Sequence, residues 1–304
     1  MSEIGIPRTS ANSEPVTTIH LTPAKEPEER AGFNDASELV NGQTSSNGLL
    51  IVNADDWGRD KETSERIFEC VARRTVSSVS AMVFMADSER AAGAAREGGV
   101  DAGLHLNLSL SFSAPGCPSR LLEHQRRVAA YLLKHPLARV IFHPGLQASF
   151  EYVVKGQLEE FERLYGAAPE RIDGHHHLHL CANVLLARLL PQGTIVRRNF
   201  HFEPGEKSLV NRLYRKAVDA RLARRHRLVD FLFPLAPLEP RRRLDHLRSL
   251  ARKFVVEVET HPVNADERLF LTGGEAVRWA GDVAIAPHFS ISARSKSRVS
   301  GAQQ

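Results

Sequence analysis

Short apolar runs alternate with longer amphipathic stretches through most of the chain. The run LLIVN at residues 49–53 is apolar until its last position, as expected of a parallel strand that is buried on both faces. In the stretch 62–73, Ile67, Cys70 and Val71 follow helical spacing. The run FVVEVET at residues 254–260 indicates another strand. From about residue 48 onward, the pattern therefore predicts repeated strand–helix units.

The same pattern can be followed to the end of the domain. The predicted strands cover residues 49–53, 77–84, 100–108, 171–175, 194–198, 228–233, 254–260 and 282–286. The predicted helices cover residues 62–73, 87–97, 120–134, 148–165, 183–190, 206–226, 239–252 and 273–280. About seven strand–helix units predict an α/β fold with a parallel sheet, best described as a distorted or incomplete (β/α) barrel. No GxGxxG follows the first strand and no GxxxxGK[ST] occurs, so dinucleotide and P-loop nucleotide sites are disfavoured.

The two ends of the chain differ from the middle in composition. Residues 1–47 are rich in Ser, Thr, Pro, Glu and Asn, and residues 293–304 (ARSKSRVSGAQQ) are similarly polar. Such segments cannot offset the entropy of ordering by burying apolar surface. We expect disordered tails at 1–47 and 293–304 around one catalytic domain at 48–292.

Charge is distributed unevenly along the chain. Residues 1–47 carry a net charge of −4, which leaves +8 on residues 48–304, and much of this excess lies in 197–253. A basic surface there would suit an anionic partner, such as a phosphate-bearing carrier or lipid-linked substrate, or peripheral contact with an anionic membrane. Solvated helix faces are the simpler interpretation of the same charges. Because aromatic residues are not interleaved with the bases, no nucleic-acid partner is expected.

The cysteines and the hydropathy pattern indicate the cellular compartment of the protein. Cys70, Cys117 and Cys181 are odd in number and form no CxxC pair, so neither a disulfide framework nor a thiolate zinc site is predicted. No window approaches the roughly 18 apolar residues of a membrane span. The first residues lack the order of a secretory signal. These features together predict a cytoplasmic protein.

Polar side chains with metal-binding or proton-transfer chemistry lie at the ends of four of the predicted strands or directly after them. These are the pair Asp55–Asp56, His105, the cluster His175–His179, and His261. Each alone has an ordinary structural explanation, as a turn, a helix cap or a hydrogen-bonded core histidine. Active sites of α/β barrels form where the carboxyl ends of the strands meet. The shared position of all four sets therefore favours one site.

The segment Asp173–His179 (DGHHHLH) is the strongest of these signals, because four histidines in five positions each need partners for their ring nitrogens. If the backbone stays extended, His175, His177 and His179 share one face. If a helix begins here, His175 and His179 share a face. Both His175 and His179 are therefore candidates for the same site.

Two histidines and an aspartate form a mixed nitrogen and oxygen ligand set. Such a set leaves positions open for water and substrate, as catalytic zinc requires, and it also suits magnesium, manganese or iron. A second carboxylate would act as a base, and His261 would protonate a leaving nitrogen. Serine-hydrolase chemistry is disfavoured because no GxSxG occurs, and nothing marks Cys181 as an activated thiol.

The combination of motifs resembles the YdjC-like (ChbG/HpnK) carbohydrate deacetylases. The matching segments are VNADDWG at 52–58, GLHLN at 103–107, DGHHHLH at 173–179 and THP at 260–262, in an order and spacing that fit residues 48–290. The resemblance implies a distorted barrel related to the polysaccharide-deacetylase group. It also implies a divalent cation, with magnesium or zinc expected, and hydrolysis of an N-acetyl group on an amino sugar.

Roles follow from the resemblance position by position. Asp56, His105 and His175 correspond to metal ligands, with His179 as the rival third ligand. Asp55 corresponds to the general base, although the two aspartates could exchange roles. His261 corresponds to the general acid, and Arg197 to an arginine that orients a catalytic carboxylate, with Arg198 beside it as the other candidate.

The chain also departs from the family pattern, with Trp57 where Phe is more common, Thr260 before the His-Pro pair, and a poorly matched basic region at 197–253. These departures bear on substrate choice more than on chemistry. A metal-dependent phosphoesterase that uses the same cluster, and a carbohydrate-binding barrel without catalysis, are the alternative functions.

Overall fold

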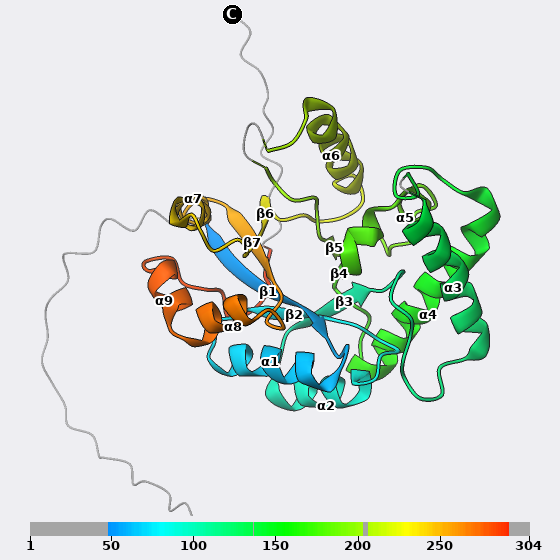
Figure 1. The fold of residues 1–304 in the computed structure, drawn as a ribbon, viewed down its shortest axis with the longest axis horizontal. Helices are drawn as coiled ribbons and strands as arrows, with labels where there is room; N and C mark the ends of the chain where they lie inside the picture. Colours follow the sequence, from blue (N-terminus) through cyan, green and yellow to red (C-terminus); the bar gives the residue numbers. More distant parts are fainter. Residues whose placement is uncertain (1–47, 136, 203–205, 292–304) are drawn as a thin grey trace, which may run out of the picture. The chain divides into compact units, whose positions relative to one another are not determined.

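Seven parallel strands form one sheet at the centre of the chain. The computed structural model describes residues 48–135, 137–202 and 206–291 (Figure 1). The strand order is β5-β4-β3-β2-β1-β7-β6, and every neighbouring pair is parallel. The predicted tails at 1–47 and 293–304 lie outside the described residues.

The elements alternate as the hydrophobic pattern predicts. The strands are β1 Leu49–Trp57, β2 Ser78–Ala81, β3 Ala102–Leu106, β4 Arg171–Gly174, β5 Ile195–Val196, β6 Phe231–Pro234 and β7 Val255–Thr260. The α-helices are α1 Lys61–Ala72, α2 Ser88–Gly98, α3 Ser119–Lys134, α4 Gln147–Tyr165, α5 Ala182–Leu186, α6 Leu209–Leu222, α7 Arg241–Ala251, α8 Ala265–Thr272 and α9 Glu275–Ala280. Two 3-10 turns, η1 Pro144–Leu146 and η2 His175–Leu180, complete the set of described helical segments.

The sheet curls into an incomplete barrel, which confirms the predicted fold class. Its two edge strands, β5 and β6, are connected through the segment that leads into β6. There Arg227 forms a parallel bridge with Ile195, and the Val196 N–H donates to the Arg227 carbonyl oxygen at 3.0 Å. The curl turns one face of every strand toward a common interior, while the helices cover the outside (Figure 1).

Strand β1 shows how the two faces differ. Leu50, Val52 and Ala54 belong to the large apolar core, whereas the alternating position Ile51 packs in a second, smaller cluster. Because side chains alternate across a strand, Asn53 and Asp55 share the face of Ile51. Apolar residues fill one end of the barrel interior, and polar residues fill the end toward which the strands run.

The small apolar cluster closes the amino-terminal end of the barrel. Ile51 of β1, Ile195 of β5 and Val229 before β6 pack there against Ala286 and Phe289, which lie near the end of the described chain. The guanidinium of Arg171 lies 4.5 Å from the Phe289 ring centroid. The polar site is therefore open at the carboxyl ends of the strands.

Several element predictions from the sequence differ from the structure in extent, and one helix was missed. The predicted strand 282–286 is reduced to a single bridge between Ile285 and Leu50, because Pro287 follows at once and has no N–H to donate. Helix α5 ends at Leu186, four residues before the predicted helix end. Helix α8 was missed because its pattern is inverted: Glu267 is buried and Leu269 is 69% exposed.

No helix in the three described ranges is both long enough and apolar enough to cross a bilayer.

Candidate active site

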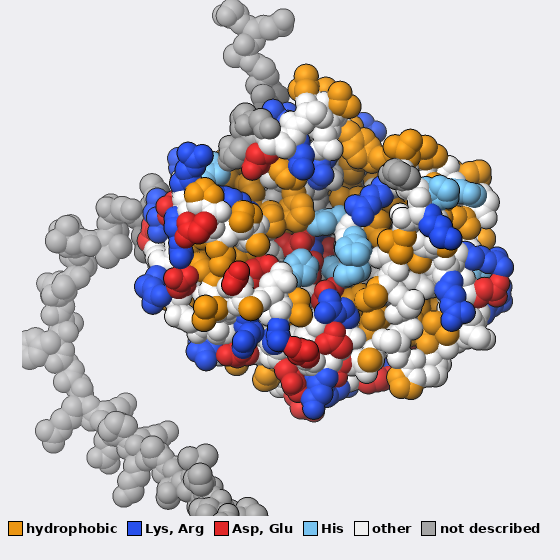
Figure 2. Space-filling model, viewed as in Figure 1, with side chains coloured by type: hydrophobic (Ala, Val, Ile, Leu, Met, Phe, Trp, Pro, Cys, Tyr) orange, Lys and Arg blue, Asp and Glu red, His pale blue; other side chains and the backbone are white. Residues whose placement is uncertain are grey.

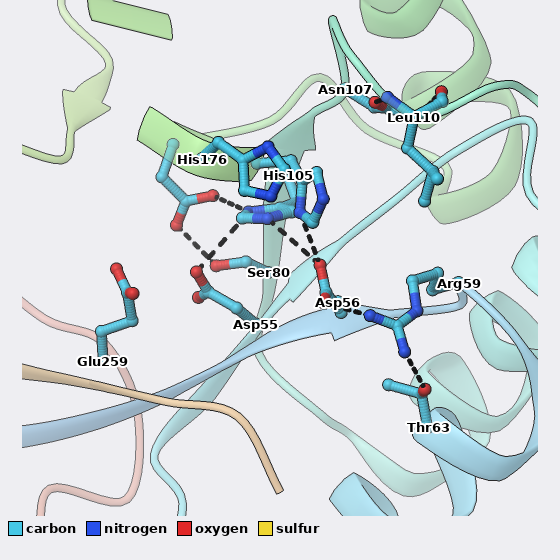
Figure 3. Close-up of polar contacts among 12 residues, drawn as sticks. Asp55, Asp56, Arg59, Thr63, Ser80, His105, Asn107, Leu110, His176 and Glu259 are labelled. Atoms are coloured by element: carbon cyan, nitrogen blue, oxygen red, sulfur yellow. Dashed lines mark hydrogen bonds and ion pairs between the residues drawn. The ribbon is translucent and has the colours of Figure 1, made fainter. Parts of the chain in front are cut away.

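Acidic and histidine side chains gather where the carboxyl ends of the strands meet. Figure 2 shows a hollow near the centre of this face in which both kinds of side chain are visible. Figure 3 shows Asp55 and Asp56 at the end of one strand, with His105 between them and the histidine turn. The predicted positions Asp55, Asp56, His105 and His175 therefore do lie together.

Asp55 and Asp56 point to different partners because the end of β1 is irregular. The pairing register of β1 with β2 shifts between Ala54 and Trp57, and Asp56 has a φ of 72°. A left-handed backbone at a residue other than glycine is strained and needs support from its surroundings. Arg59 gives that support, because its backbone N–H donates to the Asp56 carbonyl oxygen and its Nη1 donates to Asp56 Oδ2 at 2.7 Å.

Asp56, His105 and His175 form a compact set of ligand atoms. Asp56 Oδ1 lies 3.4 Å from His105 Nε2 and 3.1 Å from His175 Nδ1, and the three ligand atoms lie within 4.8 Å of one another. Asp56 Oδ1 and His105 Nε2 are buried and have no hydrogen-bond partner among the described residues. Buried polar atoms are normally satisfied, so two such atoms facing one point fit a cation bound there.

The charges around this point favour a cation as well. Burial raises the pKa of Asp56, but the adjacent His105 and His175 outweigh this effect and hold that pKa well below its ordinary value. Burial lowers the pKa of His105, but nearby Asp55 and Asp173 raise it well above the ordinary value. The negative charge of these carboxylates would therefore stabilise a cation beside His105.

Asp173 fixes the orientation of His105. The His105 Nδ1–H donates to Asp173 Oδ1 at 2.7 Å, which directs Nε2 toward Asp56. The other oxygen of Asp173 accepts a hydrogen bond from the Ser80 hydroxyl at 2.5 Å. A carboxylate behind a ligating histidine is the usual support of a metal site, because it sets both the tautomer and the angle of the ring.

Arg197 is the centre of a buried ionic network. Its Nη1 and Nη2 donate to the two oxygens of Asp55 at 2.6 and 2.8 Å, and its Nε donates to Glu257 at 2.7 Å. Nη1 also donates to Glu259 Oε2, and Nη2 lies 2.9 Å from Asp173 Oδ2. One guanidinium thus joins carboxylates from strands β1, β4 and β7.

Arg198, the rival of Arg197 in the sequence, lies outside this network. Its guanidinium donates to Asp219 of α6 and to the backbone carbonyl oxygens of Val229 and Asp230. Arg197 is therefore the arginine that contacts Asp55, and Arg198 holds α6 and the approach to β6 in place.

The histidine-rich segment takes neither of the two predicted conformations. His176 and His177 both have left-handed backbones, with φ values of 55° and 56°, so the chain turns sharply at η2. His175 faces Asp56, while His177 Nε2 lies 3.2 Å from Glu259 Oε2. Gly174 allows the turn to pack closely, because a Cβ there would lie 3.0 Å from the Cβ of His179 and the two residues would have to move apart.

His179, the rival third ligand, lies beneath the turn. Its Nε2–H donates to the carbonyl oxygen of Arg197 at 2.9 Å, and burial lowers its pKa to about 3, so the ring is neutral. It does not belong to any of the groups that could hold a metal in the described chain. The structure thus places His175, and not His179, beside Asp56 and His105.

His261 lies near Asp55, at the end of strand β7. One ligand atom from each of Asp55, Glu259 and His261 lies within 4.8 Å of the others. Glu267 of α8 anchors the loop by accepting hydrogen bonds from the His261 N–H at 2.9 Å and from the Thr260 hydroxyl at 2.7 Å. The part-buried ring of His261 therefore faces the hollow from the β7 side.

Among the residues that the structure describes, two other groups could hold a metal: Asp55, His105 and Asp173, or Asp55, Glu259 and His261. Both include Asp55, whose two oxygens already accept hydrogen bonds from Arg197. A guanidinium at that distance would also repel a cation. Of the three groups, only Asp56, His105 and His175 include ligand atoms without a hydrogen-bond partner and no residue that is hydrogen-bonded to Arg197.

Several site residues were not identified from the sequence. They support the candidate ligands and acids without belonging to the four motif positions: Ser80, Asp173, Glu257, Glu259 and Glu267. A signal for two of them is present in FVVEVET, where acids alternate with valines in a buried strand. Such alternation indicates a strand with one apolar face and one face that lines a polar interior.

The chain is similar to proteins of one family over most of its length. The model of the YdjC-like protein family matches residues 49–285. A carbohydrate deacetylase of Mus musculus is 33% identical over 144 residues, which are 44% of this chain and 44% of that protein. A chitooligosaccharide deacetylase of Serratia marcescens is 33% identical over 137 residues, which are 43% and 51% of the two chains. The matched region thus spans about half the length of these relatives.

A solved structure has the same fold. The crystal structure of a proposed cellobiose-phosphate cleavage protein of Enterococcus faecalis V583 superposes with a TM-score of 0.54 and 21% identity. The superposition covers 79% of this chain and 97% of that one. At this level of identity, the likeness extends to the fold alone.

Because Glu257 lies in this buried network, we expect it to make the free energy of unfolding depend on pH. Burial raises the pKa of Glu257 from 4.5 to about 7, against the opposing effect of Arg197. Between these two pH values the folded chain therefore binds more protons than the unfolded chain, so this carboxyl makes folding less favourable as the pH rises. Between pH 4.5 and 7.5, Glu257 should lower the free energy of unfolding of the wild type by an amount on the order of 3 kcal/mol, and the Glu257→Gln variant should lack this contribution.

Urea unfolding of the wild type and the variant across this pH range measures the difference. Glu65→Gln on the exposed side of α1 is the matched control and should keep the wild-type dependence. Equal pH dependence in the wild type and Glu257→Gln would show that Glu257 is already ionised at low pH.

Proposed function

Because the chain belongs to the YdjC-like protein family, we propose that it is a metal-dependent hydrolase that removes an N-acetyl group from an amino sugar. The substrate would be of an oligosaccharide or glycolipid type. The names of the relatives, carbohydrate deacetylase and chitooligosaccharide deacetylase, support the reaction class. The proposal identifies the hollow around Asp56 as the place of reaction.

One observation carries this proposal: two unsatisfied buried ligand atoms, on Asp56 and His105, face His175 within a single cluster. We assign these three residues as the ligands of a divalent cation, with zinc or magnesium expected. Two nitrogens and one oxygen leave coordination positions open for water and for the acetyl oxygen. When bound, the cation would polarise the acetyl carbonyl and make water a stronger nucleophile.

Asp55 is assigned as the base that accepts the proton of the attacking water. Both of its oxygens accept hydrogen bonds from Arg197, which holds the carboxylate in one orientation. Asn53 donates to Asp55 Oδ1 at 2.9 Å and adds a further constraint. The adjacent residue Asp56 faces the cation cluster, so the two carboxylates serve different purposes.

His261 is assigned as the acid that protonates the departing amine. It faces Asp55 from the end of the neighbouring strand β7, so the base and the acid would lie close together beside the scissile amide. Glu267 holds the backbone of this loop, and Pro262 restricts the conformation of His261. An amide nitrogen is a poor leaving group without a proton, so this step is required for the proposed reaction.

Acetate release tests the proposed function and its metal ligands together. The protein should release acetate from N-acetylglucosamine oligosaccharides, lose this activity with a chelator, and regain it with zinc or magnesium. His175→Ala should weaken metal binding about 100-fold, because one of three ligands is removed, and should abolish acetate release. Calorimetry measures the binding, and mass spectrometry measures the loss of one acetyl group.

The neighbouring His176→Ala is the matched control, because His176 is exposed and lies in the same turn. It should keep metal affinity. Full acetate release by Asp56→Ala combined with His105→Ala would overturn the ligand assignment. Phosphate release from sugar phosphates without any acetate release would instead support a phosphoesterase.

The two proton-transfer roles can be separated by the leaving group. Asp55→Asn should reduce kcat about 100-fold or more on every substrate, because water must always be deprotonated. His261→Ala should reduce kcat similarly on N-acetylated sugars but only slightly on 4-nitrophenyl acetate, whose leaving group departs without a proton. Steady-state kinetics with both substrates checks this. Equal losses of His261→Ala on both substrates would contradict the acid role.

A further inference from the structure

Helix α6 turns apolar side chains toward the outside of the molecule. Leu209 is 68% exposed, Val210 77%, Leu213 56% and Tyr214 40%, and all four lie in the first two turns. We call these four residues the α6 outer face. In Figure 2 apolar side chains are visible over the position of α6 at the edge of the view. Four adjacent large apolar side chains at this exposure are unusual for a helix that meets only water.

The helix is nevertheless well attached through its opposite side. Val218 and Leu222 are buried, and Asp219 accepts hydrogen bonds from Arg198 and from the Asn199 N–H. At 100° per residue, these buried positions point away from Leu209 and Leu213. The inner face thus already accounts for the attachment of α6, and the outer face is available for a different contact.

The exposed charged side chains of α6 itself have one sign. Lys216 and Arg221 flank it and are exposed, whereas the acid of the helix, Asp219, is buried. No exposed residue of α6 is acidic. An apolar stripe bordered by bases is the pattern of a helix that lies in the interface of a bilayer with anionic lipids.

The position of α6 connects this surface to the site. Arg198 binds α6 through Asp219, and the adjacent Arg197 contacts Asp55 inside the barrel. Phe202, on the way from Arg197 to α6, packs under Arg215 with the guanidinium carbon 4.9 Å from the ring centroid. These contacts connect the inner side of α6 to the segment that carries Arg197.

We propose that the α6 outer face docks the protein on an anionic lipid surface. Leu209, Val210, Leu213 and Tyr214 enter the region between headgroups and acyl chains, while Lys216 and Arg221 meet the lipid phosphates. A second copy of the chain fits less well, because a symmetric contact of two outer faces would bring these bases close to each other. The docking concerns binding and does not depend on the proposed reaction.

Vesicle co-sedimentation tests the proposal with the full chain in the presence of chelator, so that catalysis plays no part. Vesicles of phosphatidylcholine with phosphatidylglycerol should bind the protein, and vesicles of phosphatidylcholine alone should bind it at least about tenfold more weakly. Val210→Gln combined with Leu213→Gln should lower the partition coefficient on anionic vesicles about tenfold or more, because two apolar insertions are lost. Lys216→Gln combined with Arg221→Gln should reduce both the binding and its dependence on salt.

A matched control comes from another surface of the protein. Leu269 of α8 and Val277 of α9 are 69% and 60% exposed, so Leu269→Gln combined with Val277→Gln makes the same chemical change elsewhere. This variant should bind vesicles as the wild type does. Failure of the wild type to bind anionic vesicles would overturn the proposal, and so would equal losses in both apolar variants. A concentration-dependent dimer that Val210→Gln and Leu213→Gln abolish, without vesicle binding by the wild type, would instead identify a second copy as the partner.

Discussion

The buried guanidinium of Arg197 is the interaction on which the site depends. It links Asp55 of β1, Asp173 of β4, and Glu257 and Glu259 of β7 across the interior of the barrel. Burying an ion is costly unless it is paired, so neither the arginine nor the carboxylates could occupy this interior alone. Burial lowers the pKa of Arg197, but the four carboxylates raise it well above its ordinary value, and the side chain stays charged. The barrel can therefore keep a polar interior at one end while a small apolar cluster closes the other.

This network also separates two adjacent carboxylates. Asp55 is bound by Arg197 through both oxygens, so it is unsuited to a cation. Asp56, with its left-handed backbone, points to His105 and His175 and keeps one oxygen unsatisfied. Asp173 contacts both Arg197 and His105, so it couples the two halves of the site. In the proposed reaction, a residue for proton transfer and a metal ligand can thus follow each other directly in the chain.

The sequence predicted much of this arrangement, and the failures have physical reasons. The carboxyl ends of the strands could be located approximately because Asp55, His105, His175 and His261 lie at or near the ends of predicted strands, and barrels bring such ends together. The hydrogen-bond partners of these side chains could not be found from the sequence, because they are far apart along the chain. Arg197 is 142 residues from Asp55 and 60 residues from Glu257. The histidine turn was missed because periodicity predicts regular backbones, whereas His176 and His177 are left-handed and depend on the packing of Gly174 against His179. Helix α8 was missed because Glu267 is held inward to support His261, which inverts its hydrophobic pattern.

In the proposed site, Arg197 reserves Asp55 for proton transfer and leaves Asp56, His105 and His175 to bind the cation. Anomalous diffraction from a crystal soaked in manganese or zinc tests this directly, because the candidate groups share Asp55 or His105 but differ in their remaining ligands. We expect one anomalous peak bonded to Asp56 Oδ1, His105 Nε2 and His175 Nδ1, with Asp55 still paired to Arg197. A peak between Asp55, Glu259 and His261, or one bonded to His179, would contradict it.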